Sequence, residues 1–206
     1  MAYNIINLDD ICNSIEDKNK IKNIVSNYEC NLNKDVEIFF RDKAFEFSKQ
    51  GIAKTFVVTT SFQGKQVIVG YFAIATKTVE VKKNKLSSNI RKRLSKFAVN
   101  DKSSPIFEVP LPLIGQLGKN YKEGYDKLIT GDILLQMACQ KVKEAQRIMG
   151  GRFAYLECED KDRLKEFYES NGFVCFGKRN LDRDERDGNS GEYLLQMLRD
   201  LSNLKD

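Results

Sequence analysis

Three side chains that could do acid–base chemistry alternate along one short segment of this chain. Tyr155, Glu157 and Glu159 stand at every second position of Arg152-Phe-Ala-Tyr-Leu-Glu-Cys-Glu159. Alternate residues of a β-strand point to one side of the strand. Either glutamate could take up a proton through water, as could Glu108, which enters an earlier strand. Ordinary surface charge is the alternative for each of these carboxylates.

The chain contains no histidine among its 206 residues. This absence excludes Ser-His-Asp and Cys-His hydrolases, histidine-based zinc peptidases and a histidine general base. Acid–base chemistry would therefore use Tyr, Glu, Asp, Lys, Cys, the backbone or water. The five cysteines have no CxxC spacing, so we expect neither a disulfide framework nor a zinc site. They are Cys12, Cys30, Cys139, Cys158 and Cys175.

The composition is that of one soluble globular domain. Apolar residues make up 41% and charged residues 31% of the chain, which is ordinary for such a domain, and we expect a single domain over residues 1–206. No run approaches the ~20 apolar residues of a membrane span, and the N-terminus does not resemble a signal peptide. We expect a cytoplasmic protein without membrane contact. The net charge of +5 is compatible with an anionic ligand.

Periodicity and turn residues predict an alternation of helices and strands without an internal repeat. Helices are expected at 9–28 (with a break near Asp17), 35–50, 131–149 and over the segment that ends at Phe173. Strands are expected at 54–60 and 66–78, which form a hairpin, and at 113–119, 152–159, 174–177 and 193–197. Residues 79–100 form a polar, basic excursion, and 178–191 a charged loop.

The helix that opens Thr130-Gly-Asp-Ile-Leu-Leu135 begins in a way that suits an anion. A helix N-terminus presents amide donors without intrahelical partners and about half a positive charge. Thr130 can cap this helix, and Gly131 lets a ligand approach the backbone closely. An ordinary helix start after a loop is the alternative.

Four segments follow one another in an order that resembles the acetyl-CoA half of GNAT-type N-acetyltransferases. They are Val109-Pro-Leu-Pro-Leu-Ile-Gly-Gln-Leu-Gly118, the helix from Thr130, the strand 152–159 and Phe167-Tyr-Glu-Ser-Asn-Gly-Phe173. The last is the most specific. The resemblance spans residues 35–198 and implies a mixed α/β fold: a twisted, mostly antiparallel sheet with helices on both faces. The 109–118 strand and Gly51-Ile-Ala-Lys-Thr-Phe-Val and Val69-Gly-Tyr-Phe-Ala resemble the branch of toxins that acetylate aminoacyl-tRNA.

The resemblance implies acetyl-CoA as cosubstrate, with no metal. The pantetheine would pair with the strand at Gln116, Leu117 and Gly118, beside Lys119, and the pyrophosphate would lie against Leu128, Ile129, Thr130, Gly131 and Asp132. The chain departs from the family pattern of Arg or Gln, two residues, Gly, one residue and Gly. Only Gly131 matches, and Asp126 and Ile129 occupy the other two positions. Lys119, Lys122 and Lys127 could supply positive charge there.

The reaction that the resemblance implies is direct attack of a primary amine on the thioester in a ternary complex. Tyr168 would donate a proton or hydrogen bond to the departing sulfur, and Glu157 would relay the proton of the amine. A buried aromatic residue is the alternative for Tyr168.

The amine acceptor stays open between two kinds of substrate. The toxin-like alternative is the α-amine of aminoacyl-tRNA, which brings tRNA, an antitoxin and a homodimer into question as partners. A protein or small-molecule N-acetyltransferase is the second alternative. The third is a non-catalytic module that binds RNA or a protein partner through Lys82–Lys96. This basic stretch is otherwise a solvated charged loop.

Overall fold

The structure is a computed structural model of the whole chain. It describes residues 1–14, 23–99, 103–181 and 191–204. Within these ranges no helix is both long enough and apolar enough to cross a membrane.

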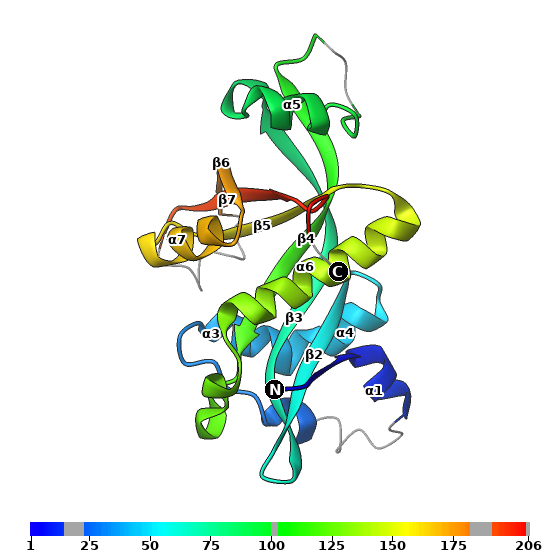
Figure 1. Ribbon diagram of the computed structural model, residues 1–206, viewed down its shortest axis with the longest axis vertical. Coiled ribbons are helices and arrows are strands. Elements are labelled where there is room, and N and C mark those ends of the chain that lie inside the picture. The colour runs from blue at the N-terminus through cyan, green and yellow to red at the C-terminus, as the bar shows by residue number, and fades with distance from the viewer. Residues whose placement is uncertain (15–22, 100–102, 182–190, 205–206) are drawn as a thin grey trace. The chain divides into compact units, whose positions relative to one another are not determined.

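The elements alternate along the chain as the sequence patterns predict (Figure 1). The strands are β1 (Tyr3–Asn7), β2 (Ala53–Phe62), β3 (Lys65–Lys82), β4 (Ile106–Lys119), β5 (Phe153–Glu159), β6 (Val174–Asn180) and β7 (Tyr193–Asp200). The helices are α1 (Leu8–Ser14), α3 (Lys34–Ile38), the π-helix η1 (Phe39–Lys43), α4 (Ala44–Lys49), the 3₁₀-helix η2 (Lys83–Lys85), α5 (Ser88–Leu94), the 3₁₀-helix η3 (Lys122–Leu128), α6 (Gly131–Met149) and α7 (Asp162–Ser170).

The strands form one sheet in the order β1-β2-β3-β4-β5-β7-β6. Strand β2 pairs antiparallel with β1 and β3, and β7 pairs antiparallel with β5 and β6. Strands β4 and β5 are parallel, with one registered pair, Leu113 opposite Tyr155. The sequence prediction of a mixed α/β fold with a mostly antiparallel sheet is confirmed.

The chain divides into two compact units, each made of two segments. The first unit comprises Met1–Ala75 and Ile114–Cys139, and the second comprises Thr76–Leu113 and Gln140–Asp206. Strands β3 and β4 and helix α6 each pass from one unit into the other. The single domain expected over 1–206 stays a prediction, and the units are described separately below.

In the first unit, helices cover both faces of the β2–β3 hairpin. The hairpin turns at Gln63 and Gly64, whose positive φ angles of 49° and 75° suit a tight two-residue turn. One face packs Val57, Tyr71 and Ala73 against α3, η1 and α4. The alternate face includes Gly70, against which Leu134 of α6 packs. The 34–49 helical segment then ends at Gly51, with φ 72°.

The second unit has its own core around the ends of β3 and β4. Its buried residues are Val79, Val81, Leu86, Leu94, Phe107, Val109, Leu111, Phe153, Tyr155, Phe176 and Leu198. Leu86 and Leu94 flank and end α5, so this short helix is anchored in the core by its apolar side chains. The prediction that residues 79–100 form a polar, basic excursion is therefore wrong. Strand β3 continues through Lys82, and α5 follows.

Most predicted elements are observed, with corrections at the short ones. Helix α6 has the predicted bounds, 131–149. Strand β1 was not predicted, and the loop expected at 178–191 begins later because Lys178–Asn180 belongs to β6. The helix expected at 9–28 is observed as α1 and as helical residues 23–26, and the part between them lies outside the described residues.

Candidate functional site

The connection from β4 to α6 lies in the first unit and is held by Asn120, which is fully buried. Its amide donates hydrogen bonds to the carbonyl oxygens of Asn27 and Ile68, both at 2.8 Å. Its side-chain oxygen accepts from the Glu29 N–H at 3.0 Å and the Lys122 N–H at 3.1 Å. All four hydrogen-bonding positions of the side chain are used. Asn120 therefore fixes the end of β4, at the start of the connection.

Gly118 is buried at a point where β4 approaches other parts of the unit closely. A Cβ atom there would meet the Tyr28 hydroxyl at 2.3 Å and Val36 Cγ1 at 2.5 Å. A Cβ on Gly70, in the neighbouring strand, would meet the Gly118 carbonyl oxygen at 2.9 Å. Both strands therefore need glycine here. Gln116, Leu117 and Lys119 are half-buried beside Gly118.

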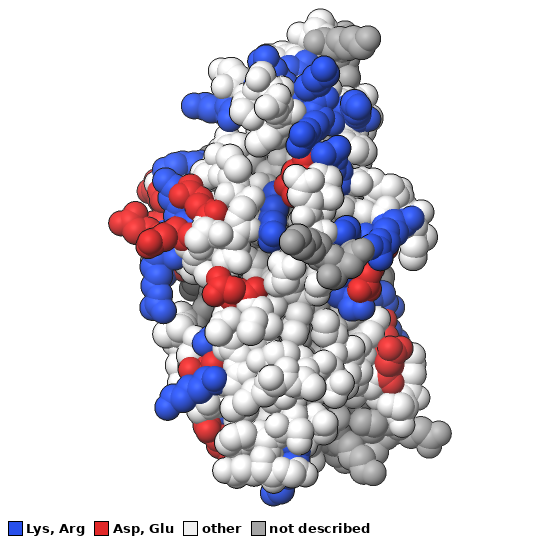
Figure 2. Space-filling view, in the orientation of Figure 1, with Lys and Arg blue, Asp and Glu red and all other residues white. Residues whose placement is uncertain are grey.

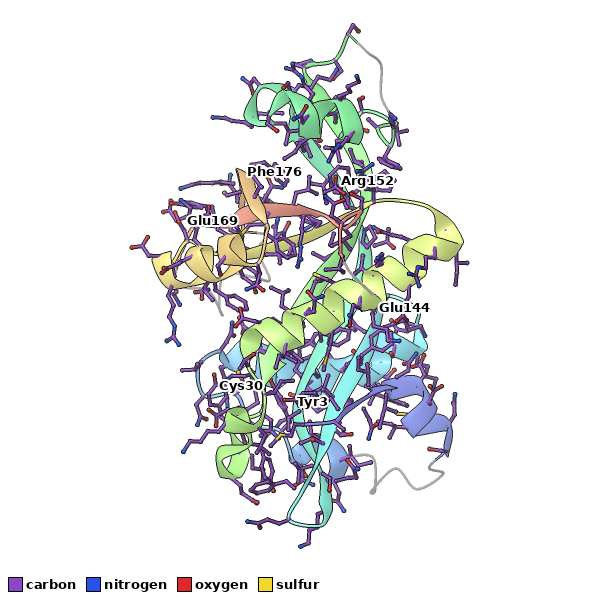
Figure 3. The ribbon with its side chains drawn as sticks, in the orientation of Figure 1. Tyr3, Cys30, Glu144, Arg152, Glu169 and Phe176 are labelled. Atoms are coloured by element: carbon purple, nitrogen blue, oxygen red, sulfur yellow. The ribbon has the colours of Figure 1, made fainter. Side chains whose placement is uncertain are left out.

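Side-chain hydrogen bonds hold the end of η3 and the start of α6. Lys119 Nζ donates to the Asp126 carbonyl oxygen at 3.0 Å. The Tyr3 hydroxyl donates to the Leu128 carbonyl oxygen at 2.7 Å (Tyr3 is labelled in Figure 3). Thr130 Oγ1 accepts from the Ile133 N–H at 3.2 Å, so Thr130 caps α6 as the sequence predicted.

The predicted pyrophosphate segment is thus a defined turn that leads into a long helix. Ile129 is buried, whereas Thr130 and Asp132 are exposed and Leu128 and Gly131 are half-buried. The N–H groups in the first turn of α6 have no intrahelical acceptor, and such groups can bind an anion. Of the three lysines considered for this site, Lys119 is bound to the loop and Lys122 contacts Asn27 Oδ1 at 3.0 Å. The third, Lys127, is exposed.

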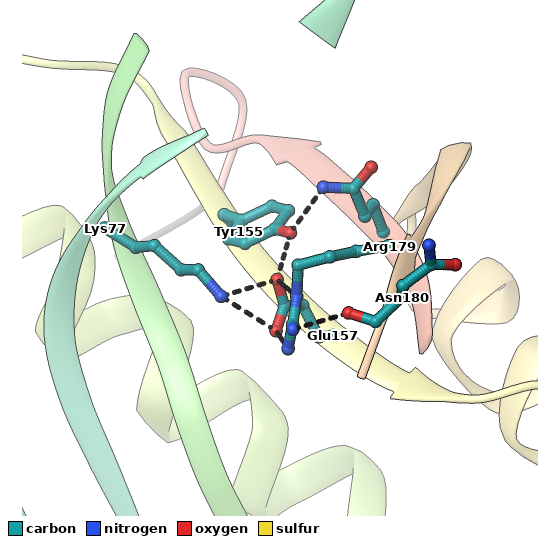
Figure 4. A network of polar contacts seen from close by, with 6 residues as sticks. Lys77, Tyr155, Glu157, Arg179 and Asn180 are labelled. Atoms are coloured by element: carbon teal, nitrogen blue, oxygen red, sulfur yellow. Dashed lines mark hydrogen bonds and ion pairs between the residues drawn. The ribbon is translucent and has the colours of Figure 1, made fainter. Parts of the chain in front are cut away.

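In the second unit, Tyr155 and Glu157 lie on one side of β5, as the alternation predicted, and form a polar network (Figure 4). The Tyr155 hydroxyl donates to Glu157 Oε1 at 2.6 Å and accepts from Gln196 Nε2 at 3.1 Å. Arg179 of β6 donates to both carboxylate oxygens, from Nε at 2.9 Å and from Nη2 at 2.6 Å. Lys77 of β3 donates to the same two oxygens, at 2.9 Å and 3.1 Å.

The network holds Glu157 as a carboxylate. Its side chain is only 10% exposed, and this burial alone raises the pKa. The donors Arg179, Tyr155 and Lys77 outweigh burial, and the pKa of Glu157 lies below its ordinary value. Burial and the adjacent carboxylate both raise the pKa of Tyr155, so its phenol stays protonated. Two cations surround one carboxylate, which leaves the cluster with net positive charge.

Tyr168 lies on α7 and is half-buried among aromatic rings. Its ring centroid is 5.0 Å from that of Phe167 and 5.9 Å from that of Phe173. The Tyr168 carbonyl oxygen accepts from the Phe173 N–H at 3.0 Å, which ties the tyrosine to the turn after α7. Burial, followed by the nearby Cys158 thiol, raises the pKa of Tyr168. The residue therefore presents a neutral phenol, which can donate a hydrogen bond or a proton.

The two catalytic candidates are not a directly bonded pair. Tyr168 lies near Cys158, and Cys158 follows Glu157 on β5, so the side chains of Cys158 and Glu157 point to opposite sides of the strand. Among the described residues, the hydrogen bonds to the Glu157 carboxylate come from Lys77, Tyr155 and Arg179. The alternative carboxylates are elsewhere: Glu159 pairs with Lys161 at 2.7 Å, and Glu108 is exposed.

Sequence reasoning missed four residues that shape these sites: Tyr3, Lys77, Asn120 and Arg179. Each acts on residues distant in the chain; Tyr3 and Leu128, for example, are 125 positions apart. The sequence carries no local signal for such pairs. In the described ranges, no group of three or more Cys, Asp or Glu side chains could hold a metal ion.

No protein-family model matches the sequence, and no curated protein matches it at a significant level. Solved structures do resemble the fold. A tyrosine-to-phenylalanine variant of KacT has a TM-score of 0.59 at 12% identity, over 95% of this chain and 94% of that one. AtaT complexed with acetyl-methionyl-tRNAfMet gives 0.59 at 14% identity, over 95% and 94%. A tyrosine-to-phenylalanine variant of the AtaT toxin, bound to the C-terminus of the antitoxin AtaR and acetyl-CoA, gives 0.57 at 12% identity, over 98% and 94%. At these identities the likeness establishes the fold alone: the chain has a GNAT-like fold of the kind that KacT and AtaT have.

Proposed function

We propose that this protein is an acetyltransferase that moves an acetyl group from acetyl-CoA to a primary amine. The observation that carries the proposal is the β4–α6 connection, a side-chain-braced turn that leads into the N-terminus of a 19-residue helix. It occurs in a fold shared with a toxin that has been solved with acetyl-CoA. Such a helix start can hold the pyrophosphate of CoA.

The proposed cofactor contacts fall on two segments of the first unit. Gln116, Leu117 and Gly118 lie at the end of β4, where backbone groups could pair with the pantetheine as an added strand would. Lys119 braces the loop that follows. Leu128, Ile129, Thr130, Gly131 and Asp132 then enclose the pyrophosphate with backbone amides.

Tyr168 is proposed to assist departure of the thiolate. The amine nitrogen attacks the thioester carbonyl carbon, the carbon–sulfur bond breaks, and the sulfur leaves with the electron pair. The neutral phenol of Tyr168 donates a hydrogen bond or its proton to that sulfur. Its raised pKa supports this role, because the phenol keeps its proton throughout the neutral range.

Glu157 is proposed to take up the proton that the amine loses, through water. Its carboxylate is charged at neutral pH but is a weak base, because Arg179, Tyr155 and Lys77 lower its pKa. A weak base favours an amine that is easily deprotonated. At pH 7 deprotonation costs about 1–1.5 kcal/mol for an α-amine with pKa near ~8, against about 4–5 kcal/mol for a lysine amine near ~10.4.

The acceptor that fits best is the α-amine of aminoacyl-tRNA. The basic side chains of α5 and of the turn after it support an RNA substrate: Arg91, Lys92 and Lys96 are exposed, and Figure 2 shows lysine and arginine side chains gathered over this region. AtaT, which has a similar fold, has been solved with acetyl-methionyl-tRNAfMet. An antitoxin partner is proposed on the same grounds, because AtaT binds AtaR.

The experiment that tests this proposal incubates the purified protein with radiolabelled acetyl-CoA and a cell extract. RNase-sensitive label in the nucleic-acid fraction supports acetylation of aminoacyl-tRNA. Label confined to proteins or small molecules would support acetyltransferase activity and exclude tRNA as the acceptor. No transferred label, with RNA still bound through α5, supports a non-catalytic binding module instead.

A further inference from the structure

The segment from the end of η3 to the first turn of α6 must be held in shape with a single glycine, Gly131. The other glycine of the β4–α6 connection, Gly124, lies earlier, inside η3, with φ 77°. Glycine permits conformations in which several consecutive amides face one ligand. A loop built from residues with side chains needs its peptide planes oriented by other contacts. The contacts in this unit are those of Lys119, Tyr3 and the Thr130 cap.

The Tyr3 hydroxyl orients one particular peptide plane. It donates to the Leu128 carbonyl oxygen at 2.7 Å. In a planar trans peptide the C=O and the following N–H point in opposite directions, so this bond turns the Ile129 N–H away from β1. The Ile129 side chain is buried, which fixes the other side of the same residue. In the described part of the chain we find no hydrogen-bond acceptor for the Ile129 N–H.

Strand β1 keeps Tyr3 in place from the edge of the sheet. Tyr3 stands opposite Thr60 in the antiparallel pair with β2. The Thr60 hydroxyl also donates to the carbonyl oxygen of Ala2 at 2.7 Å, and this bond holds the strand without touching the loop. The hydroxyl of Tyr3 thus links β1 directly to the end of η3.

We propose that Tyr3 is a positioning residue for CoA, whose hydroxyl holds the Leu128–Ile129 peptide so that the Ile129 N–H faces the pyrophosphate. This inference rests on the proposed function, since it assumes that CoA binds at this connection. Tyr3 itself does not touch the ligand. Its hydrogen bond from an edge strand orients a peptide plane that a glycine-rich loop could orient through its own backbone freedom.

The test compares the wild type with Tyr3→Phe, which removes only the hydroxyl, by titration calorimetry with CoA and with pantetheine, which lacks the pyrophosphate. We expect the affinity for CoA to fall about 3- to 10-fold, the size of one lost hydrogen bond. The affinity for pantetheine should change less than about twofold by the same estimate. Hydrogen exchange of the amides of residues 126–132 should become faster in the variant.

Tyr193→Phe is the matched control, because it removes a tyrosine hydroxyl that donates to Asp160 in the second unit and does not reach the loop; its CoA affinity should equal that of the wild type. If the wild type does not bind CoA, the proposed function fails and this inference fails with it. If the wild type binds CoA and Tyr3→Phe binds it equally well, only the inference fails. An equal loss for CoA and pantetheine would also overturn it, because that would indicate general loosening of the strand.

Discussion

The protonation state of Tyr168 decides what this residue can contribute. Burial beside Cys158 raises its pKa, so the phenol is a hydrogen-bond donor across the neutral range and not a base. We predict that Tyr168→Phe lowers kcat about 100-fold, while the affinity for CoA and the melting temperature change little. Steady-state kinetics and calorimetry on the same preparation would measure both.

Tyr193→Phe is the control for this substitution. Its hydroxyl bonds to Asp160 at 2.7 Å on the surface of the second unit, and no catalytic role is proposed for it. An unchanged kcat in Tyr168→Phe would contradict the role of the phenol in thiolate departure. A loss of CoA binding in that variant would show that Tyr168 shapes the cofactor site and not the chemistry.

The Glu157 carboxylate should matter for stability because it is the shared counter-ion of Lys77 and Arg179. We predict that Glu157→Gln lowers the free energy of unfolding by about 3 kcal/mol, since Lys77 and Arg179 would face each other without a counter-ion. Urea unfolding at pH 7 would measure it. The control is Glu159→Gln, whose partner Lys161 is 53% exposed and whose loss should cost at most about 1 kcal/mol.

The difference in unfolding free energy between the wild type and Glu157→Gln should shrink as the pH falls. The pKa of Glu157 in the folded protein is below its ordinary value of 4.5, so the carboxylate stabilises the fold above that pH. The contribution is lost as the pH falls through the folded pKa. The stability of the wild type should therefore approach that of Glu157→Gln in acid. A difference that persists unchanged to low pH would contradict the ionic origin of the effect.

At the residue scale, the sequence predicts the pair on β5 but not what holds it. Alternation is enough to place Tyr155 and Glu157 on one side, and the 2.6 Å contact agrees. Lys77 lies 80 positions from Glu157, and Arg179 lies 22 positions away. These contacts depend on how β3, β5 and β6 are arranged in space, which no local spacing encodes.

Among the elements, β4 is the one whose packing is least tolerant of change. We predict that Gly118→Ala destabilises the protein by about 1–3 kcal/mol, because the new methyl group would lie 2.3 Å from the Tyr28 hydroxyl and 2.5 Å from Val36. CoA binding should weaken too, since the strand must shift. Thermal unfolding and calorimetry would measure the two effects.

Gly177→Ala provides the comparison within β6. Its added methyl would meet only the Gln196 side chain, at 2.8 Å from Oε1 and 3.9 Å from Cδ. That side chain can shift at the cost of its hydrogen bond to the Tyr155 hydroxyl. We expect a much smaller change in stability. Equal tolerance of both substitutions would mean that β4 is not packed as tightly as described.

Helix α5 and the turn after it are proposed to contact RNA. We predict that changing Arg91, Lys92 and Lys96 together to Gln weakens tRNA binding and reduces the slope of log K against log salt by about 3, about one for each lost phosphate contact. Arg93 is left unchanged because it pairs with Asp200 at 2.8 Å. Filter binding at several salt concentrations would measure the slope.

The matched control removes the same charge from exposed lysines of the first unit, Lys43, Lys49 and Lys65. Its salt dependence should stay close to that of the wild type. If both triple variants lose affinity equally, binding follows net charge alone and α5 has no special role.

At the element scale, long periodic segments are predictable and short ones are not. The apolar pattern of α6 is long enough to define both of its ends. Strand β1 has five residues and mixes asparagine with isoleucine, so its alternation is too short to recognise. Helix α5 has seven residues, three of them basic in its last turn, and its helicity depends on the burial of Leu94 in the tertiary core.

On the scale of the whole molecule, the fold is predictable because several segments occur in an order that is typical of one architecture. The proline-flanked strand, the helix start after Thr130 and the Phe167–Phe173 ending each have ordinary alternatives, but their succession favours one architecture. The acceptor cannot be read in the same way, because it depends on surface chemistry that many sequences could provide. Acetylation of aminoacyl-tRNA must therefore be tested as a reaction.

The measurement that tests this claim most directly uses purified aminoacyl-tRNA, unlabelled acetyl-CoA and the protein, followed by nuclease digestion and mass spectrometry of the terminal aminoacyl-adenosine. We predict an added acetyl group on the α-amine, absent with uncharged tRNA and strongly reduced with Tyr168→Phe. An unmodified aminoacyl-adenosine, from a preparation that binds both CoA and tRNA, would contradict acetylation of aminoacyl-tRNA.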